Sequence, residues 1–135
     1  MKATYSFRID RARGLIRIQM SGLFTMADIA GFLEARQRAH AELGCRPNQH
    51  MTLNDLSSMK IQSQEVVTAF REMLADPAFR SRRLAFVAAQ TLARSQLMRA
   101  LDGRDARCFD SVGEAEAWLL AEEADEMPQP RYAIR

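Results

Sequence analysis

The sequence predicts a single α/β domain with the element order β-β-α-β-α-β-α-β-α and a mostly parallel sheet of five strands. Strands that alternate with helices along a chain indicate right-handed crossovers and parallel pairing. Three of the five strand segments alternate apolar and polar residues, whereas a sheet covered on both sides needs strands that are apolar on both faces. We therefore expect the helices to lie mainly on one face, with the other face partly exposed to water.

The first two strands are expected to form a β-hairpin. Residues 5–10 alternate, with Tyr5, Phe7 and Ile9 on one side, and residues 15–21 alternate again after a short link that contains a glycine. Two runs of period two that are joined by such a link are typical of an antiparallel hairpin.

A helix is predicted over residues 26–43. Thr25 followed by Asp28 resembles a capping box at its start, and Gly44 suits the position just after its end. The expected buried side consists of Ile29, Phe32, Leu33 and Leu43.

The later elements follow the same rules of periodicity and capping. Residues 83–89 are apolar on both faces, which favours an interior position in the sheet. The segments expected after the first helix are a strand at 50–55, a helix at 64–76 capped by Ser63, the strand at 83–89, a helix from Thr91 to Asp102, a strand at 106–109 and a last helix from Val112.

Composition indicates one globular domain over residues 1–123, followed by a polar tail at 124–135. No apolar run is long enough to span a membrane, and the N-terminus lacks the apolar core of a signal peptide. We therefore expect a cytoplasmic protein whose two cysteines, Cys45 and Cys108, are free thiols.

The charge distribution argues against nucleic acid as a partner. The net charge is only +2, and residues 111–135 hold two arginines against six acidic residues. The basic run at 80–83 has few aromatic neighbours, whereas a nucleic-acid surface is more basic and carries stacking aromatics.

The segment CFDSVGEAEAWLL, residues 108–120, brings a thiol, a carboxylate and a hydroxyl close together. Ser111 with Glu114 forms the pattern S-x-x-E of a capping box, and Asp110 lies where the helix dipole favours negative charge. The inward residues expected for the helix that starts at Val112 are Val112, Ala115, Trp118 and Leu119. We interpret this segment as a strand end and a helix cap, with Cys108 as a small buried apolar residue.

No metal, cofactor or catalytic site is expected. His40, Cys45 and His50 are evenly spaced, but they lack a fourth ligand and the tight pair spacing of a zinc site, so both histidines are interpreted as surface or interface residues. The chain also lacks the glycine-rich phosphate loops, the nucleophile elbow and the metalloprotease motif. These absences predict a protein without enzymatic activity.

The most suitable place for a contact is the polar segment that follows the third strand. It leads from the carboxyl end of that strand to a helix N-terminus, where ligands collect in α/β sheets and free N–H groups can receive an anion. The candidate residues for a partner or anion contact are Asp55, Ser57, Ser58, Ser63 and Gln64.

Three short patterns carry a resemblance to a known fold family. The chain has SG at 21–22, DLS at 55–57 and the pattern F-x-S-x-x-E-A-x-x-W-L from Phe109 to Leu119. Together with the strand order, these patterns resemble bacterial STAS domains, which act as anti-sigma-factor antagonists, and more closely their SpoIIAA-like relatives, which share a fold with CRAL-TRIO lipid-transfer domains. The resemblance covers residues 4–122 and implies β-α units with the helices on one face.

The resemblance implies a regulatory, protein-binding role without enzymatic activity. In the antagonists a serine in a D-S-S-G motif is phosphorylated, but at the family's spacing that serine position falls on Gln64 and the Asp position on Ser63. A phosphorylation switch is therefore not implied, unless an offset of one residue places the acceptor at Ser63. The alternative is a domain that binds a lipid or another small apolar ligand between its helices and its sheet.

A homodimer or a weaker self-association is also expected. The partly exposed sheet face offers a surface for self-association. Of the eight methionines, Met26, Met59 and Met98 lie off the predicted core stripes, where their flexible side chains suit adaptable contacts.

Overall fold

A computed structural model describes residues 2–46, 48–88 and 106–126 of the 135-residue chain. The elements are β1 (Thr4–Asp10), β2 (Leu15–Gly22), α1 (Met26–Leu43), β3 (Met51–Met59), α2 (Gln64–Ala75), the 3₁₀ helix η1 (Pro77–Phe79), β4 (Arg83–Val87), β5 (Ala106–Phe109) and α4 (Val112–Glu126). The predicted order is confirmed for the strands and for α1, α2 and α4, whereas η1 was not predicted. The helix predicted from Thr91 lies outside the described residues.

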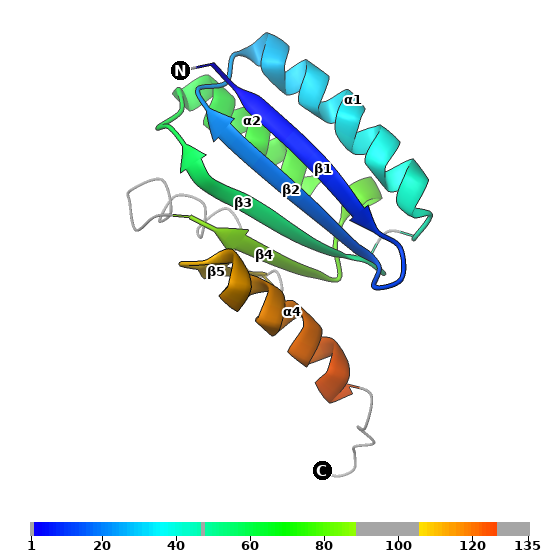
Figure 1. Ribbon diagram of the computed structural model, residues 1–135. Coiled ribbons are helices and arrows are strands. Elements are labelled where there is room, and N and C mark those ends of the chain that lie inside the picture. Colours follow the sequence, from blue (N-terminus) through cyan, green and yellow to red (C-terminus); the bar gives the residue numbers. More distant parts are fainter. Residues whose placement is uncertain (1, 47, 89–105, 127–135) are drawn as a thin grey trace.

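The five strands form one sheet in the order β1-β2-β3-β4-β5 (Figure 1). β1 and β2 pair antiparallel as the predicted hairpin, and the other neighbours pair parallel. The predicted α/β class with a mostly parallel sheet is therefore confirmed. β4 has the expected interior position, between β3 and β5.

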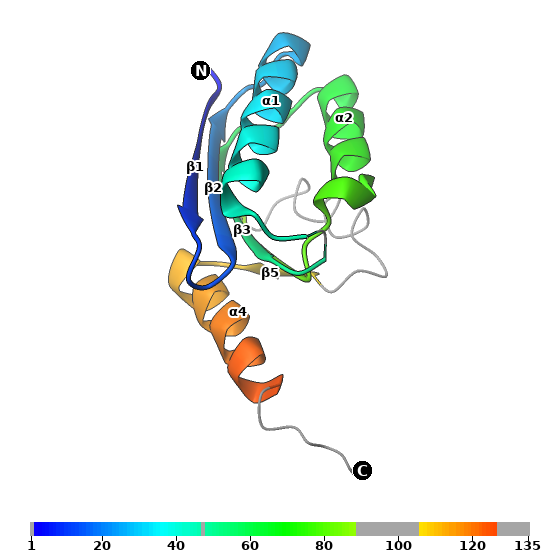
Figure 2. The same ribbon diagram turned by 90° about the vertical axis from the view of Figure 1, so that its right-hand side faces the viewer.

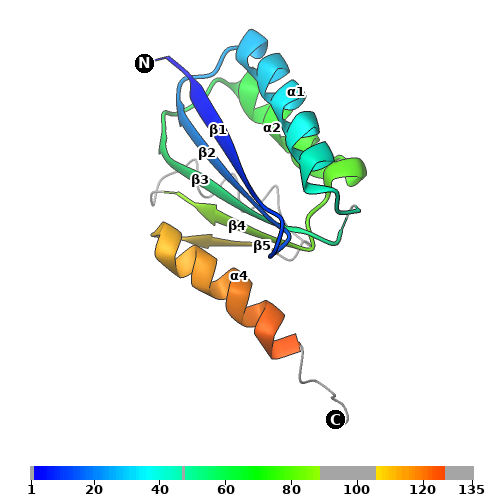
Figure 3. The same ribbon diagram turned by 45° about the vertical axis from the view of Figure 1, so that its right-hand side comes forward.

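The helices lie on both faces of the sheet. Figure 2 shows α1 and α2 together on one side of the strands, and Figure 3 shows α4 beside β4 and β5. Alternate residues of the strands serve the two layers: Ile16 and Ile18 of β2 pack with residues of α1, whereas Leu15 packs with Ala115 and Leu119 of α4. The expectation of helices mainly on one face holds for α1 and α2 but not for α4.

The face opposite α1 is polar and open over the hairpin. Ser6 and Arg8 of β1 and Gln19 of β2 are exposed there, because α4 packs mainly against β3, β4 and β5 and reaches the hairpin at Leu15 and Arg17 of β2. This confirms the prediction of a partly wet sheet face.

The caps of α1 agree with the sequence pattern. The Thr25 hydroxyl accepts a hydrogen bond from the Asp28 N–H, and the Asp28 carboxylate accepts one from the Thr25 N–H, while Gly44 ends the helix at a φ of 78°. The hydrogen bonds that the Asp28 carboxylate accepts from the Thr25 N–H and from the Thr25 hydroxyl hold the pKa of Asp28 below its ordinary value. Within the described part of the chain, no helix has the length and apolar content of a membrane-spanning segment.

Two predicted core positions are wrong. Leu33 of α1 is 39% exposed and Val112 of α4 is 40% exposed, whereas Ile29, Phe32, Leu43, Ala115 and Leu119 are buried as expected. Leu33 follows Phe32 by one position, which is a rotation of about 100° around a helix. Only one of the two can therefore face the sheet directly, and Val112 lies in the first turn of its helix.

β3 is longer than predicted, and it is buried on both sides over residues 51–54. It continues to Met59 instead of ending near residue 55, because its later residues extend the parallel pairing with β2 up to Gly22. Gly22 has a φ of 84°, and a Cβ at that position would collide with the backbone carbonyl of Lys2. A glycine is therefore required where the N-terminal segment passes the end of β2.

Candidate functional site

The predicted contact segment lies at the carboxyl edge of β3 and the start of α2. Asp55 belongs to β3 as predicted, and Ser57 also belongs to β3 instead of the predicted loop. The two residues bond each other: the Asp55 Oδ1 accepts from the Ser57 N–H at 3.1 Å and from its hydroxyl at 2.6 Å. The Asp55 carboxylate is therefore engaged locally. Nothing in this geometry by itself assigns a ligand to the pair.

The other three candidate residues are exposed. Ser58 lies opposite Ser21 in the β2–β3 register, and Gln64 is the first residue of α2. The Ser63 hydroxyl accepts a hydrogen bond from the Val66 N–H at 3.3 Å, which confirms the predicted helix cap. The structure thus brings the candidates to one edge, while their part in binding stays a prediction.

Gln62 joins the two connections at this edge. Its Oε1 accepts from the Phe24 N–H at 2.9 Å, and its Nε2 donates to the Gly22 carbonyl at 2.9 Å and to the Lys60 carbonyl. The β2–α1 and β3–α2 connections are therefore held side by side. The sequence carries no signal for this role, because a glutamine in a polar segment looks like any solvated residue.

Exposed apolar side chains lie on the two connections that Gln62 joins. Leu23 is 47% exposed, Met26 at the start of α1 is 43% exposed, and Ile61 is 80% exposed. We call these three residues the edge patch. The serines at 57, 58 and 63 flank it in the sequence, so apolar and polar groups occur together at this end of the sheet.

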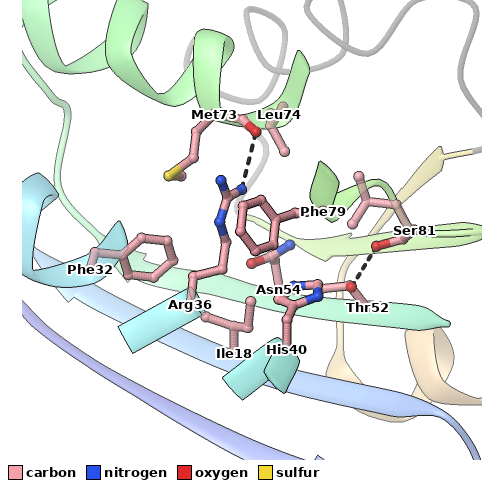
Figure 4. Close-up of a pocket in the computed structure, with 11 residues that line it drawn as sticks. Ile18, Phe32, Arg36, His40, Thr52, Asn54, Met73, Leu74, Phe79 and Ser81 are labelled. Carbon is pink, nitrogen blue, oxygen red and sulfur yellow. Dashed lines mark hydrogen bonds between the residues drawn. The ribbon is translucent and has the colours of Figure 1, made fainter. Parts of the chain in front are cut away.

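A small cavity lies at the other end of the domain, between the sheet, α1 and α2. Its volume is about 50 Å³, which is room for a few water molecules. The polar residues among its lining are Arg36, His40, Thr52, Asn54 and Ser81 (Figure 4). Sequence analysis did not identify this site, because its residues come from four separate segments.

Arg36 crosses the cavity from α1 to the end of α2. Its Nη1 donates to the Met73 carbonyl at 3.1 Å, and its guanidinium lies 4.2 Å from the centre of the Phe79 ring. The side chain is buried, and burial lowers the pKa of Arg36 against the opposing effect of Asp76. An arginine in the middle of an amphipathic helix would ordinarily be assigned to the solvent side.

His50 is not a surface residue, so that interpretation is wrong for His50, whereas His40 is half-buried. His50 is 1% exposed, and its ring lies edge-on to the ring of His40 with the centres 4.7 Å apart. His40 also packs against the Phe79 ring at 4.8 Å. The fold brings the end of α1 to the start of β3, which the sequence separation does not reveal.

Burial keeps both imidazoles neutral. It lowers the pKa of His40 to about 4, with further contributions from His50 and Arg36. Burial also lowers the pKa of His50, although the nearby Arg46 carbonyl opposes this effect. The His50 Nε2 lies 3.3 Å from the Ser81 hydroxyl, which in turn bonds the Thr52 hydroxyl at 2.6 Å.

Asn54 is a buried amide whose side chain bonds no other residue in the part of the chain that the structure describes. It is 7% exposed, and among the described residues its side chain makes no hydrogen bond, although it lines the cavity. A buried carboxamide offers both donors and an acceptor, and native proteins rarely leave such groups unsatisfied. The cavity therefore has hydrogen-bonding capacity available for a small molecule or water.

The other sequence candidates have structural roles. The Ser111 hydroxyl accepts from the Glu114 N–H at 3.2 Å, which confirms the predicted cap of α4. Cys45 packs against the core between the sheet and α1. Over residues 2–46, 48–88 and 106–126, no group of three or more His, Cys, Asp or Glu side chains is arranged to hold a metal ion.

No family model and no curated protein matches the sequence. Among solved structures, an uncharacterised protein of the DUF3478 family from Shewanella loihica, described as having a SpoIIAA-like fold, superimposes with a TM-score of 0.68. The match covers 88% of this chain and 96% of that protein at 15% sequence identity. The fold is SpoIIAA-like.

The SpoIIAA-like fold confirms the resemblance that the strand order and the three short patterns indicated. Since the similar structure is itself uncharacterised, the likeness transfers no ligand or activity. The edge patch and the cavity are therefore the features from which a function can be inferred.

Proposed function

We propose that this SpoIIAA-like domain is a non-enzymatic, regulatory protein-binding module of the cytoplasm, and that its partner docks on the edge patch of Leu23, Met26 and Ile61. The observation that carries this proposal is the 80% exposure of Ile61. A large aliphatic side chain exposed to this extent gains free energy when a partner removes it from water.

The backbone around Ile61 supports the proposal. Gln62 bonds the β2–α1 connection on one side of it, and the Lys60 N–H donates to the Gly22 carbonyl at 3.1 Å. A partner would therefore meet an ordered surface and would lose little free energy in ordering it. The serine hydroxyls beside the patch supply the polar rim that protein interfaces commonly have.

The alternative function, binding of a lipid or another small apolar ligand, has less support than protein binding, because the cavity is small and partly polar. Pockets for drug-sized ligands measure roughly 300–1,000 Å³, whereas this cavity measures about 50 Å³ and is lined in part by Arg36, His40 and Asn54. A lipid chain would need more space and a more apolar lining. The small volume and polar lining of the cavity therefore favour a protein as the partner over a lipid.

The proposal is tested by affinity capture with quantitative mass spectrometry. Wild-type protein and an Ile61→Ser, Leu23→Ser variant are used as bait in lysate of the source organism, and we expect a protein bound by the wild type to be depleted on the variant. Val112→Ser is the matched control, because Val112 is 40% exposed on α4, away from the patch. This control should retain the partner.

The partner then has to bind the purified domain directly, with affinity reduced at least tenfold by Ile61→Ser. Equal binding by wild type and the patch variant would refute docking on the edge patch. Native mass spectrometry of the purified protein tests the alternative, since a co-purifying lipid would contradict the proposed module.

A further inference from the structure

Arg36 is a buried cation without a close carboxylate partner among the described residues. Its side chain is 11% exposed, and the nearest carboxylate oxygen is the Asp76 Oδ2, at 3.8 Å from Nη2. Asp76 is 42% exposed, and its other oxygen accepts from the Ala78 N–H at 3.0 Å. Water therefore screens this ion pair, although buried charges in proteins are ordinarily closely paired.

Two further groups at the same cavity have unused hydrogen-bonding capacity. Asn54 is only 7% exposed, and its side chain makes no hydrogen bond among the described residues. Figure 4 shows its carboxamide between Arg36 and Thr52. His40 has ring contacts but no hydrogen bond in the part of the chain that the structure describes. A cation, an amide donor and an imidazole therefore border one space.

We propose that this cavity is a binding site for a small oxyanion, a carboxylate or a phosphate group, held by Arg36, Asn54 and His40. Its volume of about 50 Å³ admits one such group but not a long chain. The Arg36 guanidinium supplies the charge, the Asn54 amide donates a hydrogen bond, and His40 donates another. Hydrogen bonds from charged or buried donors to an oxyanion are among the stronger ones in proteins.

Binding of the anion is coupled to protonation of His40. The charged and titratable groups around this imidazole are Arg36 on α1, His50 before β3, Asp76 before η1 and, beyond His50, Arg82 before β4. In the empty cavity the positive neighbours and burial disfavour the imidazolium. A bound anion reverses this balance, because an opposite charge within a few ångströms favours the charged form. The affinity should therefore rise as the pH falls from neutral towards 5.

The proposal is tested by NMR titration of the imidazole protons. The chain has two histidines, so a His40→Gln variant assigns both sets of signals. Sodium acetate and sodium phosphate are compared with sodium chloride at equal ionic strength. We expect one or both oxyanions to raise the pKa of His40 by about one unit and to increase the melting temperature. Acetate alone indicates a carboxylate ligand, and phosphate alone indicates a phosphoryl ligand.

Two variants with opposite expected effects make the result specific. Asn54→Leu keeps the size of the side chain and removes its donors, so both oxyanion effects should disappear in a protein that still folds. Asp76→Asn removes the competing carboxylate while an amide oxygen can still accept from the Ala78 N–H, so binding should tighten severalfold. The proposal is overturned if neither oxyanion exceeds chloride in the wild type, or if the effects persist unchanged in Asn54→Leu.

Discussion

Arg17 on β2 and Glu116 on α4 form an ion pair in which Nη2 lies 2.6 Å and Nε lies 2.8 Å from the Glu116 Oε2. The two residues are 99 positions apart in the chain. Arg17 belongs to the set of β2 residues that face α4, while its neighbours Ile16 and Ile18 face α1. The pair thus ties the last helix to the middle of the sheet.

Glu116→Gln should lower the free energy of unfolding by about 1 kcal/mol. Because the pair is half-buried, its contribution to stability should be larger than that of an exposed ion pair and smaller than that of a buried hydrogen bond to a charged group. Urea unfolding followed by circular dichroism measures the change. Glu34→Gln is the control, because Glu34 is exposed on α1 and makes no ion pair among the described residues. An equal effect of both substitutions would contradict the role given to Glu116.

Acidification should destabilise the domain through the buried histidines. The folded state holds the pKa of His40 at about 4, below its ordinary value of 6.5, so the unfolded chain binds the proton first as the pH falls. Stability is therefore complete above about pH 6.5 and is lost progressively down to pH 4. The His40 contribution should amount to about 1–2 kcal/mol, allowing for its partial exposure.

This pH dependence is measured as the free energy of unfolding in urea at several pH values between 4 and 8. Carboxylates also titrate near pH 4, so the informative quantity is the difference between wild type and His40→Gln. We expect the variant to lose less stability over this range. Parallel curves for the two proteins would show that His40 stays exposed enough to titrate normally.

Ser63 should act as a helix cap. Ser63→Ala removes the acceptor of the Val66 N–H and should destabilise the domain by about 1 kcal/mol, whereas Ser63→Asp should be tolerated because Asp caps equally well. Ser58→Ala is the matched control, since Ser58 is exposed and caps no helix. Thermal unfolding of the three variants distinguishes these outcomes.

We expect no phosphorylation at this edge of the sheet. At the spacing of the antagonists that the sequence resembles, the phosphoserine position falls on Gln64, and the Ser63 hydroxyl is engaged in capping α2. Incubation with lysate and ATP followed by intact-mass measurement should show no added phosphate at Ser57, Ser58 or Ser63. A phosphate on Ser63 would contradict this expectation and support a phosphorylation switch, because a helix N-terminus accommodates the added negative charge.

Leu119 and Leu33 should differ sharply in their contributions to stability. Leu119 is fully buried between α4 and the sheet, so Leu119→Ala should cost about 2–5 kcal/mol. Leu33 is 39% exposed, so Leu33→Ala should cost well under half of that amount. Chemical denaturation of both variants tests the assignment of the two faces, and similar losses would place Leu33 in an interface that this chain alone does not form.

Local patterns were sufficient to predict most of the described elements and the caps at Thr25, Ser63 and Ser111, but not η1 or the full length of β3. The alternation around Phe7 and Ile18, the capping box of Thr25 and Asp28, and the Ser63 cap all involve residues within a few positions of one another. Their physical cause is local, because strand and helix periods and end hydrogen bonds depend on neighbouring residues. The hairpin, α1 and the start of α2 could therefore be predicted closely from the sequence.

The sequence by itself thus determined the α/β class, the order of elements and the polar edge at residues 55–64. Tertiary structure alone decided that α4 packs on the second face of the sheet and that Gln62 joins the connection that holds Ile61 to the one that holds Leu23. It also buried Arg36, His40 and Asn54 around one cavity. The reason is that each of these features depends on contacts between distant segments, which no local periodicity encodes. From the sequence, Arg36 and His40 of α1 would be assigned to solvent, because β3 and η1, which pack near them, come later in the chain.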